Sequence, residues 1–264
     1  MKKLVIIFIL LISIKGFSQD SYFLGKTNYC TPQDAGSKKG FETAFLALNY
    51  PKYYGGVTNL LLKIAEKDPK YCDAYFMAGY FLRLQDMHKE ALAAYYMADS
   101  LAQNKAPIFK QNLAIQFMRF GKVDEARKKY EEMVKYFPEN PEGYYGIGNT
   151  SIVIGDYEEG LKNLKQAEDL YKASGKVKDD VVCMYGMLHT LKENYETALP
   201  YLDDAYATYK NDDGYLSIYA LALIKVGKSK NDEKLIKKAM KTYKKIKDKV
   251  IADEISKKLT SEFS

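Results

Sequence analysis

Residues with the types and spacing that catalysis requires are scarce in this chain of 264 residues. Its two histidines, His88 and His189, belong to no His-Glu-x-x-His helix, and the sequence has neither a Gly-x-Ser-x-Gly elbow nor a Gly-rich phosphate loop after a strand. Three pairs of adjacent aspartates could supply two carboxylates, but they fall near expected helix starts or on exposed faces, where acids favour the helix amino terminus or meet water. These pairs are Asp179 with Asp180, Asp203 with Asp204, and Asp212 with Asp213. We therefore expect no enzyme, no catalytic residue and no cofactor, and a catalytic site recruited between structural elements is only a third hypothesis.

The three cysteines also offer little chemistry. No Cys-x-x-Cys motif or Cys–His pairing supports metal binding or redox catalysis, so we expect no metal site. Cys30 lies in an irregular segment and Cys72 at the start of an expected helix, so a disulfide between them would staple the amino-terminal segment to the helical region, with a stabilisation of about 3–4 kcal/mol. The sequence leaves that bridge open. Cys183, within an expected helix, is interpreted as a small packing or groove residue.

The dominant feature of the sequence is a set of small residues that recurs at a period of about 34. Two antiparallel helices can approach closely only where their facing side chains are small, so each unit needs a small residue on its first helix opposite another on its second. A third small position lets the next unit settle against the previous one, because a single helix pair cannot bury its apolar face alone. The three series are Gly79, Ala114, Gly148, Gly186 and Ala220; Ala91, Ala126, Gly160 and Ala198; and Ala98, Met133, Ala167 and Ala205.

Together with Gly121, Gly155 and Gly227, which are expected in turns, and Pro138 at the end of a unit, this pattern resembles the tetratricopeptide repeat (TPR), a helix–turn–helix of 34 residues. The resemblance implies an all-α fold, a right-handed superhelical solenoid of antiparallel helix pairs with about five repeats. The units are expected at 72–106, 107–140, 141–178, 179–212 and 213–246. A degenerate helical capping unit at 38–71 and a capping helix with tail at 247–264 would cover the ends of the solenoid at 72–246.

Departures from the family pattern are expected to alter single turns and helices. Glu193 stands where the fourth unit should have its turn glycine, and Pro200 lies inside the expected second helix, where its missing amide should delay or bend that helix. In the fifth unit Asp232 replaces the second-series residue, and the turn after Gly227 is expected to be long.

The first eighteen residues differ in kind from the rest. Lys2 and Lys3 precede an apolar run at 4–14, and small residues follow it at positions that a signal peptidase recognises. We interpret 1–18 as a secretory signal peptide and 19–37 as an irregular segment. An uncleaved anchor is the alternative, although the run is shorter than the roughly 20 residues that span a bilayer. The protein is therefore expected to be exported by a bacterium, to the periplasm or the medium, with no integral membrane span after cleavage.

A lysine-rich block lies near the end of the chain, where 228–258 holds twelve lysines and five acidic residues. Such a block could contact anionic lipid, a cell-wall polymer or nucleic acid, but lysines beside the apolar positions Ala239 and Tyr243 favour a solvated helix face. We do not expect nucleic acid as a partner, because the protein is expected outside the cytoplasm and carries no motif that reads RNA or DNA.

The resemblance also implies a binding surface, since this family usually binds in the concave groove lined by the first helices. The corresponding positions mix aromatic, methionine and amide side chains, which suits a docked helix or an extended segment. Capture of a peptide carboxyl terminus is disfavoured, because Phe76 and Tyr80 stand where the family's carboxylate clamp needs Lys and Asn. We call these groove positions on the first helices the stripe. The alternative is that part of the stripe packs against the amino-terminal segment or the terminal helix. The groove positions are Phe76, Tyr80, Arg83, Gln111, Ile115, Met118, Tyr145, Asn149, Ile152 and Met187, with Cys183 and Thr190 beside them.

The 24 tyrosines divide between core and groove. Tyrosine fills large apolar positions and tolerates partial exposure through its hydroxyl, so Tyr95, Tyr130, Tyr185 and Tyr219 are expected in the core, whereas Tyr80 and Tyr145 are groove candidates. The leading hypothesis is an exported scaffold that holds a peptide or helix of another cell-envelope protein in its groove. The alternative is a structural component that self-associates within an envelope complex.

Overall fold

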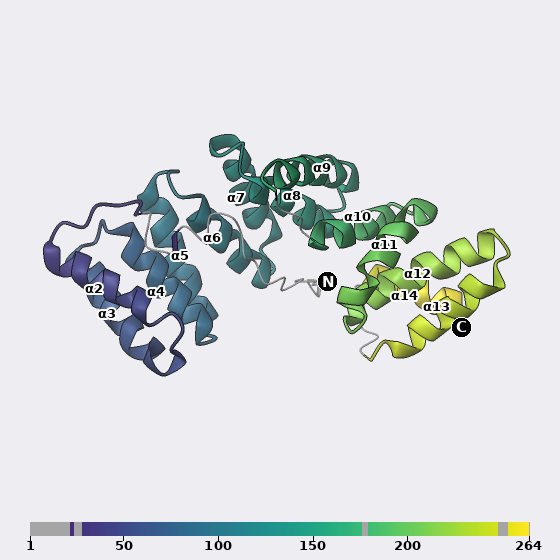
Figure 1. The fold of residues 1–264 in the computed structure, drawn as a ribbon, viewed down its shortest axis with the longest axis horizontal. Helices are drawn as coiled ribbons and strands as arrows, with labels where there is room; N and C mark the ends of the chain where they lie inside the picture. The colour runs from purple at the N-terminus through teal and green to yellow at the C-terminus, as the bar shows by residue number, and fades with distance from the viewer. Residues whose placement is uncertain (1–21, 24–27, 176–178, 248–252, 264) are drawn as a thin grey trace. The chain divides into compact units, whose positions relative to one another are not determined.

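The computed structural model describes residues 22–23, 28–175, 179–247 and 253–263, and every regular element among them is a helix (Figure 1). The predicted signal peptide at 1–18 lies outside the described residues. The chain divides between Gly143 and Tyr144 into two compact units, which we call the amino-terminal unit and the carboxy-terminal unit.

The amino-terminal unit is a stack in which each helix packs against the next. Its first described residues, Tyr22, Phe23 and 28–34, form what we call the arm. Helix α2 begins directly after the arm because the Asp34 side chain accepts a hydrogen bond from the Ser37 N–H at 3.0 Å. The helices that follow are α2 (Ala35–Leu46), the short 3-10 helix η1 (Pro51–Tyr53), α3 (Tyr54–Lys67), α4 (Cys72–Leu84), α5 (His88–Ala102), α6 (Pro107–Arg119) and α7 (Val123–Tyr136).

The carboxy-terminal unit continues the same alternation of helices. Helix α8 begins just before the boundary between the units, and α14 packs on α12 near the end of the chain. The helices are α8 (Pro141–Ile154), α9 (Tyr157–Ala173), α10 (Asp179–Leu191), α11 (Tyr195–Tyr209), α12 (Asp213–Ser229), α13 (Glu233–Lys245) and α14 (Asp253–Phe263). The five pairs from α4 with α5 to α12 with α13 begin at the residues where the five repeats are expected to begin.

A residue with a left-handed backbone lies in the turn between the two helices of each pair. The expected turn glycines Gly121 and Gly155 have φ angles of 73° and 95°, and Glu193 takes the same region with a φ of 64°. The turn therefore requires a left-handed backbone conformation and not a glycine as such. In the first and fifth pairs Asp86 and Asn231, residue types that tolerate this conformation, adopt it.

The expectation that Gly227 lies in a turn is wrong. Helix α12 continues through Gly227 to Ser229, and the turn follows it. Packing explains the glycine instead, because a Cβ at this position would lie 2.9 Å from Cγ1 of Ile236 on α13. A small residue is needed here for close approach of two helices and not for backbone freedom.

The small-residue series do place the helices of a pair in close contact. A Cβ on Gly79 would lie 2.9 Å from a ring carbon of Tyr95 and 3.3 Å from the carbonyl oxygen of Ala91. In the third pair, a Cβ on Gly148 would lie 3.5 Å from the carbonyl oxygen of Gly160. First-series residues thus face second-series residues, as the spacing predicts.

Pro200 does not delay its helix, which corrects that part of the prediction. Helix α11 begins at Tyr195, right after the turn, and includes Pro200. The ring is exposed to solvent, and proline removes only one backbone donor. The helix therefore tolerates the proline near its first turns.

The apolar core of the carboxy-terminal unit is centred on α12. This helix is buried along nearly its whole length, with Tyr215, Tyr219 and Leu223 fully shielded from solvent. Helices α10, α11 and α13 pack on it, and α14 adds Ile255 and Leu259 to the same cluster. Helix α14 thus covers an apolar face that would otherwise meet water.

Candidate functional site

The amino-terminal unit carries the predicted groove residues of α4 and α6. Phe76, Gln111 and Met118 are buried, whereas Tyr80 and Ile115 are partly exposed, as is Arg83, whose guanidinium lies 5.0 Å from the Tyr80 ring centroid.

The arm of the same chain covers part of this stripe. The Tyr22 ring is fully buried and meets Phe76 edge to face at 5.1 Å and Phe109 at 5.8 Å between ring centroids. Next to it, Phe23 lies 4.5 Å from Tyr80. The alternative in which the stripe packs against the amino-terminal segment is therefore confirmed for Phe76. This arrangement adds aromatic pairing to ordinary apolar burial.

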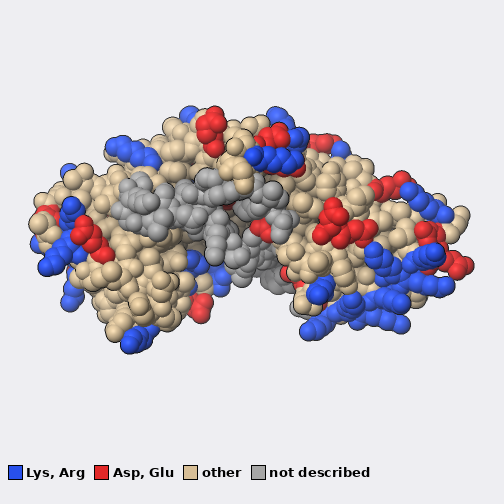
Figure 2. All heavy atoms as spheres, viewed as in Figure 1, with Lys and Arg blue, Asp and Glu red and all other residues tan. Residues whose placement is uncertain are grey.

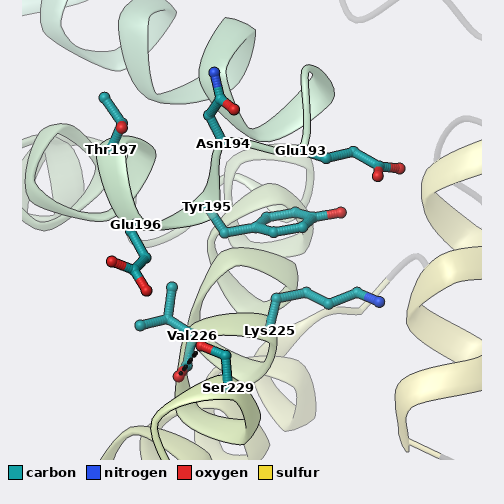
Figure 3. A pocket seen from close by; sticks show the side chains of 8 residues that line it. All are labelled: Glu193, Asn194, Tyr195, Glu196, Thr197, Lys225, Val226 and Ser229. Atoms are coloured by element: carbon teal, nitrogen blue, oxygen red, sulfur yellow. Dashed lines mark hydrogen bonds between the residues drawn. The ribbon is translucent and has the colours of Figure 1, made fainter.

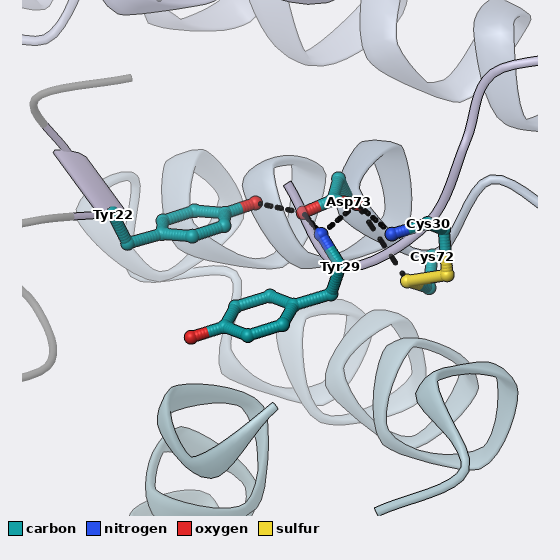
Figure 4. Close-up of a disulfide and its surroundings, with 5 residues drawn as sticks. All are labelled: Tyr22, Tyr29, Cys30, Cys72 and Asp73. Carbon is teal, nitrogen blue, oxygen red and sulfur yellow. Dashed lines mark hydrogen bonds between the residues drawn. A yellow bond between two sulfur atoms is a disulfide. The ribbon is translucent and has the colours of Figure 1, made fainter. Parts of the chain in front are cut away.

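A buried carboxylate fastens the arm to α4, as Figure 4 shows. Asp73, fully buried in the first turn of α4, accepts hydrogen bonds from the Tyr22 hydroxyl at 2.9 Å, the Tyr29 N–H at 3.1 Å and the Cys30 N–H at 2.8 Å. Burial raises the pKa of Asp73, while these three donors act in the opposite direction by stabilising the charged form. Sequence reasoning missed Asp73, because a lone acid in a first helical turn is ordinarily interpreted as a helix-dipole partner.

A disulfide closes the same attachment. Cys30 and Cys72 are bonded with a Cα–Cα distance of 5.7 Å, so the bridge that the sequence left open is present (Figure 4). The ligand atoms of Cys30, Cys72 and Asp73 lie within 4.8 Å of one another. Both sulfurs are used in the disulfide, however, so only the carboxylate has a ligand atom to offer a metal.

In the carboxy-terminal unit two of the four predicted groove residues are core residues. Tyr145 belongs to an apolar cluster with Leu164 and Tyr185, and Met187 belongs to the cluster around α12. Cys183 and Thr190 are also buried. Asn149 and Ile152 are partly exposed, so they are the predicted members on this unit that a partner could reach without rearrangement. The groove assignment of all ten residues stays a prediction, and Tyr145 is placed with the core tyrosines.

The histidines are placed in structural settings. His88 begins α5, with Nε2 3.4 Å from Oδ1 of Asp86 in the preceding turn, and His189 stacks on Tyr201 at 5.9 Å. Burial lowers the pKa of both imidazoles, so both are neutral at pH 7. Neither arrangement supplies a nucleophile with an oriented base.

Two open clefts lie outside the predicted stripe. One cleft, of about 480 Å³ and mixed polarity, is lined by Glu193 and Asn194 of the turn, by residues 195–197 at the start of α11, and by Lys225, Val226 and Ser229 of α12 (Figure 3). Its rim charges are paired, since Lys225 lies 2.6 Å from Glu262 and Glu193 accepts from Lys258 at 2.7 Å. At Lys225 and Glu193 the cleft therefore offers a ligand no unpaired charge.

The second cleft, of about 460 Å³, lies on α2, η1 and α3 and is mostly apolar. Its rim carries Leu46, Tyr50 and Tyr53, whose exposed fractions are 75%, 55% and 52%. Large side chains gathered at such exposures are typical of surfaces that contact another protein.

No helix in the described part of the chain is long and apolar enough to cross a bilayer. A family sequence model of the tetratricopeptide repeat matches residues 112–174, which run from within α6 to the end of α9. The chain therefore contains tetratricopeptide repeat sequence at these residues, and its helix pairs have the fold of that repeat. TPR proteins typically act as non-catalytic scaffolds for protein–protein interaction, and this TPR protein has the fold for that role.

Solved structures share the fold at low sequence identity. PilF of Pseudomonas aeruginosa superimposes with a TM-score of 0.63 at 15% identity, covering 88% of this chain and 100% of that one. The TPR protein YrrB, described as having an unusual peptide-binding site, gives 0.54 at 15% identity, covering 76% and 97%. The Cut9–Hcn1 hetero-tetramer of the APC/C gives 0.61 at 16% identity and 86% coverage of this chain, which spans only 43% of that chain. No curated protein matches the sequence significantly.

Proposed function

We propose that this TPR protein is an exported scaffold that binds a peptide or helix of another cell-envelope protein along the first helices of its repeats. On the amino-terminal unit a partner would contact the partly exposed members of the predicted stripe, Tyr80, Arg83 and Ile115. The carboxy-terminal unit by itself offers Asn149 and Ile152. These side chains combine apolar anchors with hydrogen-bonding groups, which suits a docked segment.

The observation that supports this proposal is the way α4 and α6 hold the arm. The arm lies outside the helix pairs, and its aromatic rings insert beside Phe76 and Phe109 while its backbone N–H groups donate to Asp73. A face that holds one segment by aromatic anchors and backbone hydrogen bonds has the chemistry to hold another beside it. YrrB, with its peptide-binding site, provides a precedent for the fold.

Export is supported by two features of the chain. The leader has the charge, length and small-residue ending that processing needs, and the Cys30–Cys72 disulfide fits an oxidising compartment. Intact-mass measurement of the protein purified from its host tests this point, with a mature chain expected to begin near Gln19. A chain that keeps Met1 would indicate a membrane anchor instead.

Site-specific photocrosslinking in intact cells tests the binding proposal. A photoreactive residue at Ile115 or Asn149 should capture a partner, whereas the same residue at Lys128 or Lys162, exposed on second helices, should not. Changing Ile115 to Ala should then weaken capture by about 2 kcal/mol if it is a hot spot, with little loss of helicity. Equal capture from all four positions would remove the stripe from the binding site.

Self-association is the second candidate, and the apolar cleft on α2, η1 and α3 favours it. Leu46, Tyr50 and Tyr53 would be shielded from water if two copies met there. Light scattering over a hundredfold concentration range should then show a dimer that Leu46→Asp disrupts. A monomer at every concentration would rule this assembly out.

A further inference from the structure

The outer face of α13 carries an unusual density of positive charge. Six of its thirteen residues are exposed lysines, and its one acidic residue is Glu233 at the start. In Figure 2 basic side chains gather over the part of the carboxy-terminal unit where Figure 1 places α13. At about 100° per residue, all six lysines fall within about 60° of Lys241 around the helix axis. They are Lys234, Lys237, Lys238, Lys241, Lys244 and Lys245, which we call the basic face.

The packing of α13 presents this face rigidly. Ala239 and Thr242 are buried on the opposite side, and Tyr243 stacks on Phe263 of α14 with ring centroids 4.3 Å apart. The helix cannot roll to bring its lysines toward acidic groups elsewhere without breaking these contacts. The charges therefore point together into solvent.

Among the described residues, carboxylates pair with two of the six lysines of the basic face, and a third lysine donates to a neutral hydroxyl. Lys237 pairs with Glu233 at 3.4 Å, Lys238 with Asp203 at 2.7 Å, and Lys245 donates to the Tyr206 hydroxyl at 2.7 Å. Lys234, Lys241 and Lys244 make no ion pair with any described residue.

The arrangement is unfavourable for the isolated protein. Lysines four residues apart, such as Lys237 with Lys241 and Lys241 with Lys245, repel each other on a helix. A solvated helix face usually alternates the two signs of charge and gains from such pairs instead. A cost that the fold does not require suggests an external anionic partner.

The chemistry of the face favours a lipid surface as that partner. All six cations are lysines, whose flexible stems and point charges suit many headgroups at once, while arginine, which grips one phosphate with two parallel hydrogen bonds, is absent. Met240, 49% exposed, lies at the edge of the lysines and can enter the headgroup layer. Because lysine stems can bend toward a plane, six lysines on this narrow arc along about 17 Å of helix can reach one flat surface together.

We propose that the basic face of α13 docks this protein on an anionic lipid bilayer. This role uses a face formed by a second helix of a repeat, so it is independent of partner binding on the first helices. Docking would concentrate the scaffold at the membrane surface by electrostatic attraction, which makes it reversible and sensitive to salt.

Co-sedimentation with vesicles tests the proposal. The full chain, as purified from its host, is mixed with vesicles of phosphatidylcholine containing 30% phosphatidylglycerol or with vesicles of phosphatidylcholine alone. We expect binding to the anionic vesicles only, with loss of at least tenfold in apparent affinity between 50 mM and 500 mM salt. Binding that is equal for both vesicles would overturn the proposal.

Matched variants locate the contact. Lys234→Gln, Lys241→Gln and Lys244→Gln together should weaken binding at least fivefold. The control Lys39→Gln, Lys63→Gln and Lys128→Gln removes the same charge from exposed lysines of the amino-terminal unit and should change binding less than twofold. Whatever the leader contributes is the same in both variants, and circular dichroism confirms that both fold.

Two results would contradict the assignment. Equal weakening by both triple variants would mean that net charge alone drives attachment. Tighter binding to a DNA duplex than to anionic vesicles at the same salt, lost in the α13 variant, would assign the face to nucleic acid instead.

Discussion

The most direct test of the helix packing is the change Gly160→Ala. A Cβ on Gly160, in α9, would lie 2.6 Å from Cβ of Ser151 and 3.0 Å from its Oγ, in α8. Carbon atoms pack at about 3.5 Å or more, so the contact is short by about 0.9 Å. No rotamer change relieves it, because a Cβ moves only with its backbone. Helices α8 and α9 would have to separate.

The magnitude follows from two opposing effects. Alanine in place of glycine in an unstrained helix stabilises by up to about 1 kcal/mol. Overpacking of a tight contact costs about 1–3 kcal/mol, so we expect Gly160→Ala to lower the free energy of unfolding by about 1–2 kcal/mol. Gly56 in α3 is the matched control, since a Cβ there would meet nothing within 4 Å. Gly56→Ala should therefore raise the free energy of unfolding, whereas Gly160→Ala lowers it.

Urea denaturation followed by circular dichroism measures both changes. A third variant, Gly160→Ala with Ser151→Gly, removes the atoms that clash and should recover stability, with a coupling energy of about 1–2 kcal/mol. The reasoning is refuted if Gly160→Ala is as stable as the original chain, or if the second substitution recovers nothing.

Three further experiments test other contacts. Replacing Cys30 and Cys72 by Ser should lower the free energy of unfolding by about 4 kcal/mol, given the 42-residue separation of the bridged cysteines. In urea denaturation, reductant should destabilise the original chain and leave the double variant unchanged. An equal response of the two proteins would contradict the bridge. Hydrogen bonds from Lys225 and Lys228 hold the pKa of Glu262 below its ordinary value. The interactions of the Glu262 carboxylate therefore stabilise the folded state above about pH 4.3, and this stabilisation is lost as the pH falls through the lowered pKa. Glu262→Gln should thus lower the Tm at pH 7 and leave it unchanged at pH 2, and an equal loss at both would exclude this ion pair as the cause. Burial raises the pKa of Cys183 to about 12, so iodoacetamide should label it only after denaturation, and labelling of the native chain at pH 8 would contradict its burial.

The repeat architecture was predictable because it depends on local spacing. The small-residue series placed the starts of five helix pairs, and the contacts of Gly79 and Gly148 agree with the predicted opposition of small residues. Gly227 shows where this reasoning fails. A glycine near a helix end fits both a turn and a close packing position, and only the length of α12 separates the two.

The candidate site was predictable only in part, because exposure depends on what covers a residue. The register placed Phe76 and Met187 on a face, but it could not show that Tyr22 covers the one and the α12 cluster encloses the other. Asp73 gave no signal in the sequence, since its three donors come from residues more than forty positions away.

The sequence by itself determined the helix pairs, their order and the lack of catalytic motifs, because helix periodicity, small contact residues and turn positions are local properties of the chain. Tertiary structure decided which faces stay open. It joined Cys30 to Cys72, fastened the arm to α4 through Asp73, buried Tyr145 in a core, and turned the lysines of α13 together into solvent. The physical reason is that burial and charge exposure depend on the three-dimensional neighbours of a side chain, and those neighbours come from distant parts of the sequence.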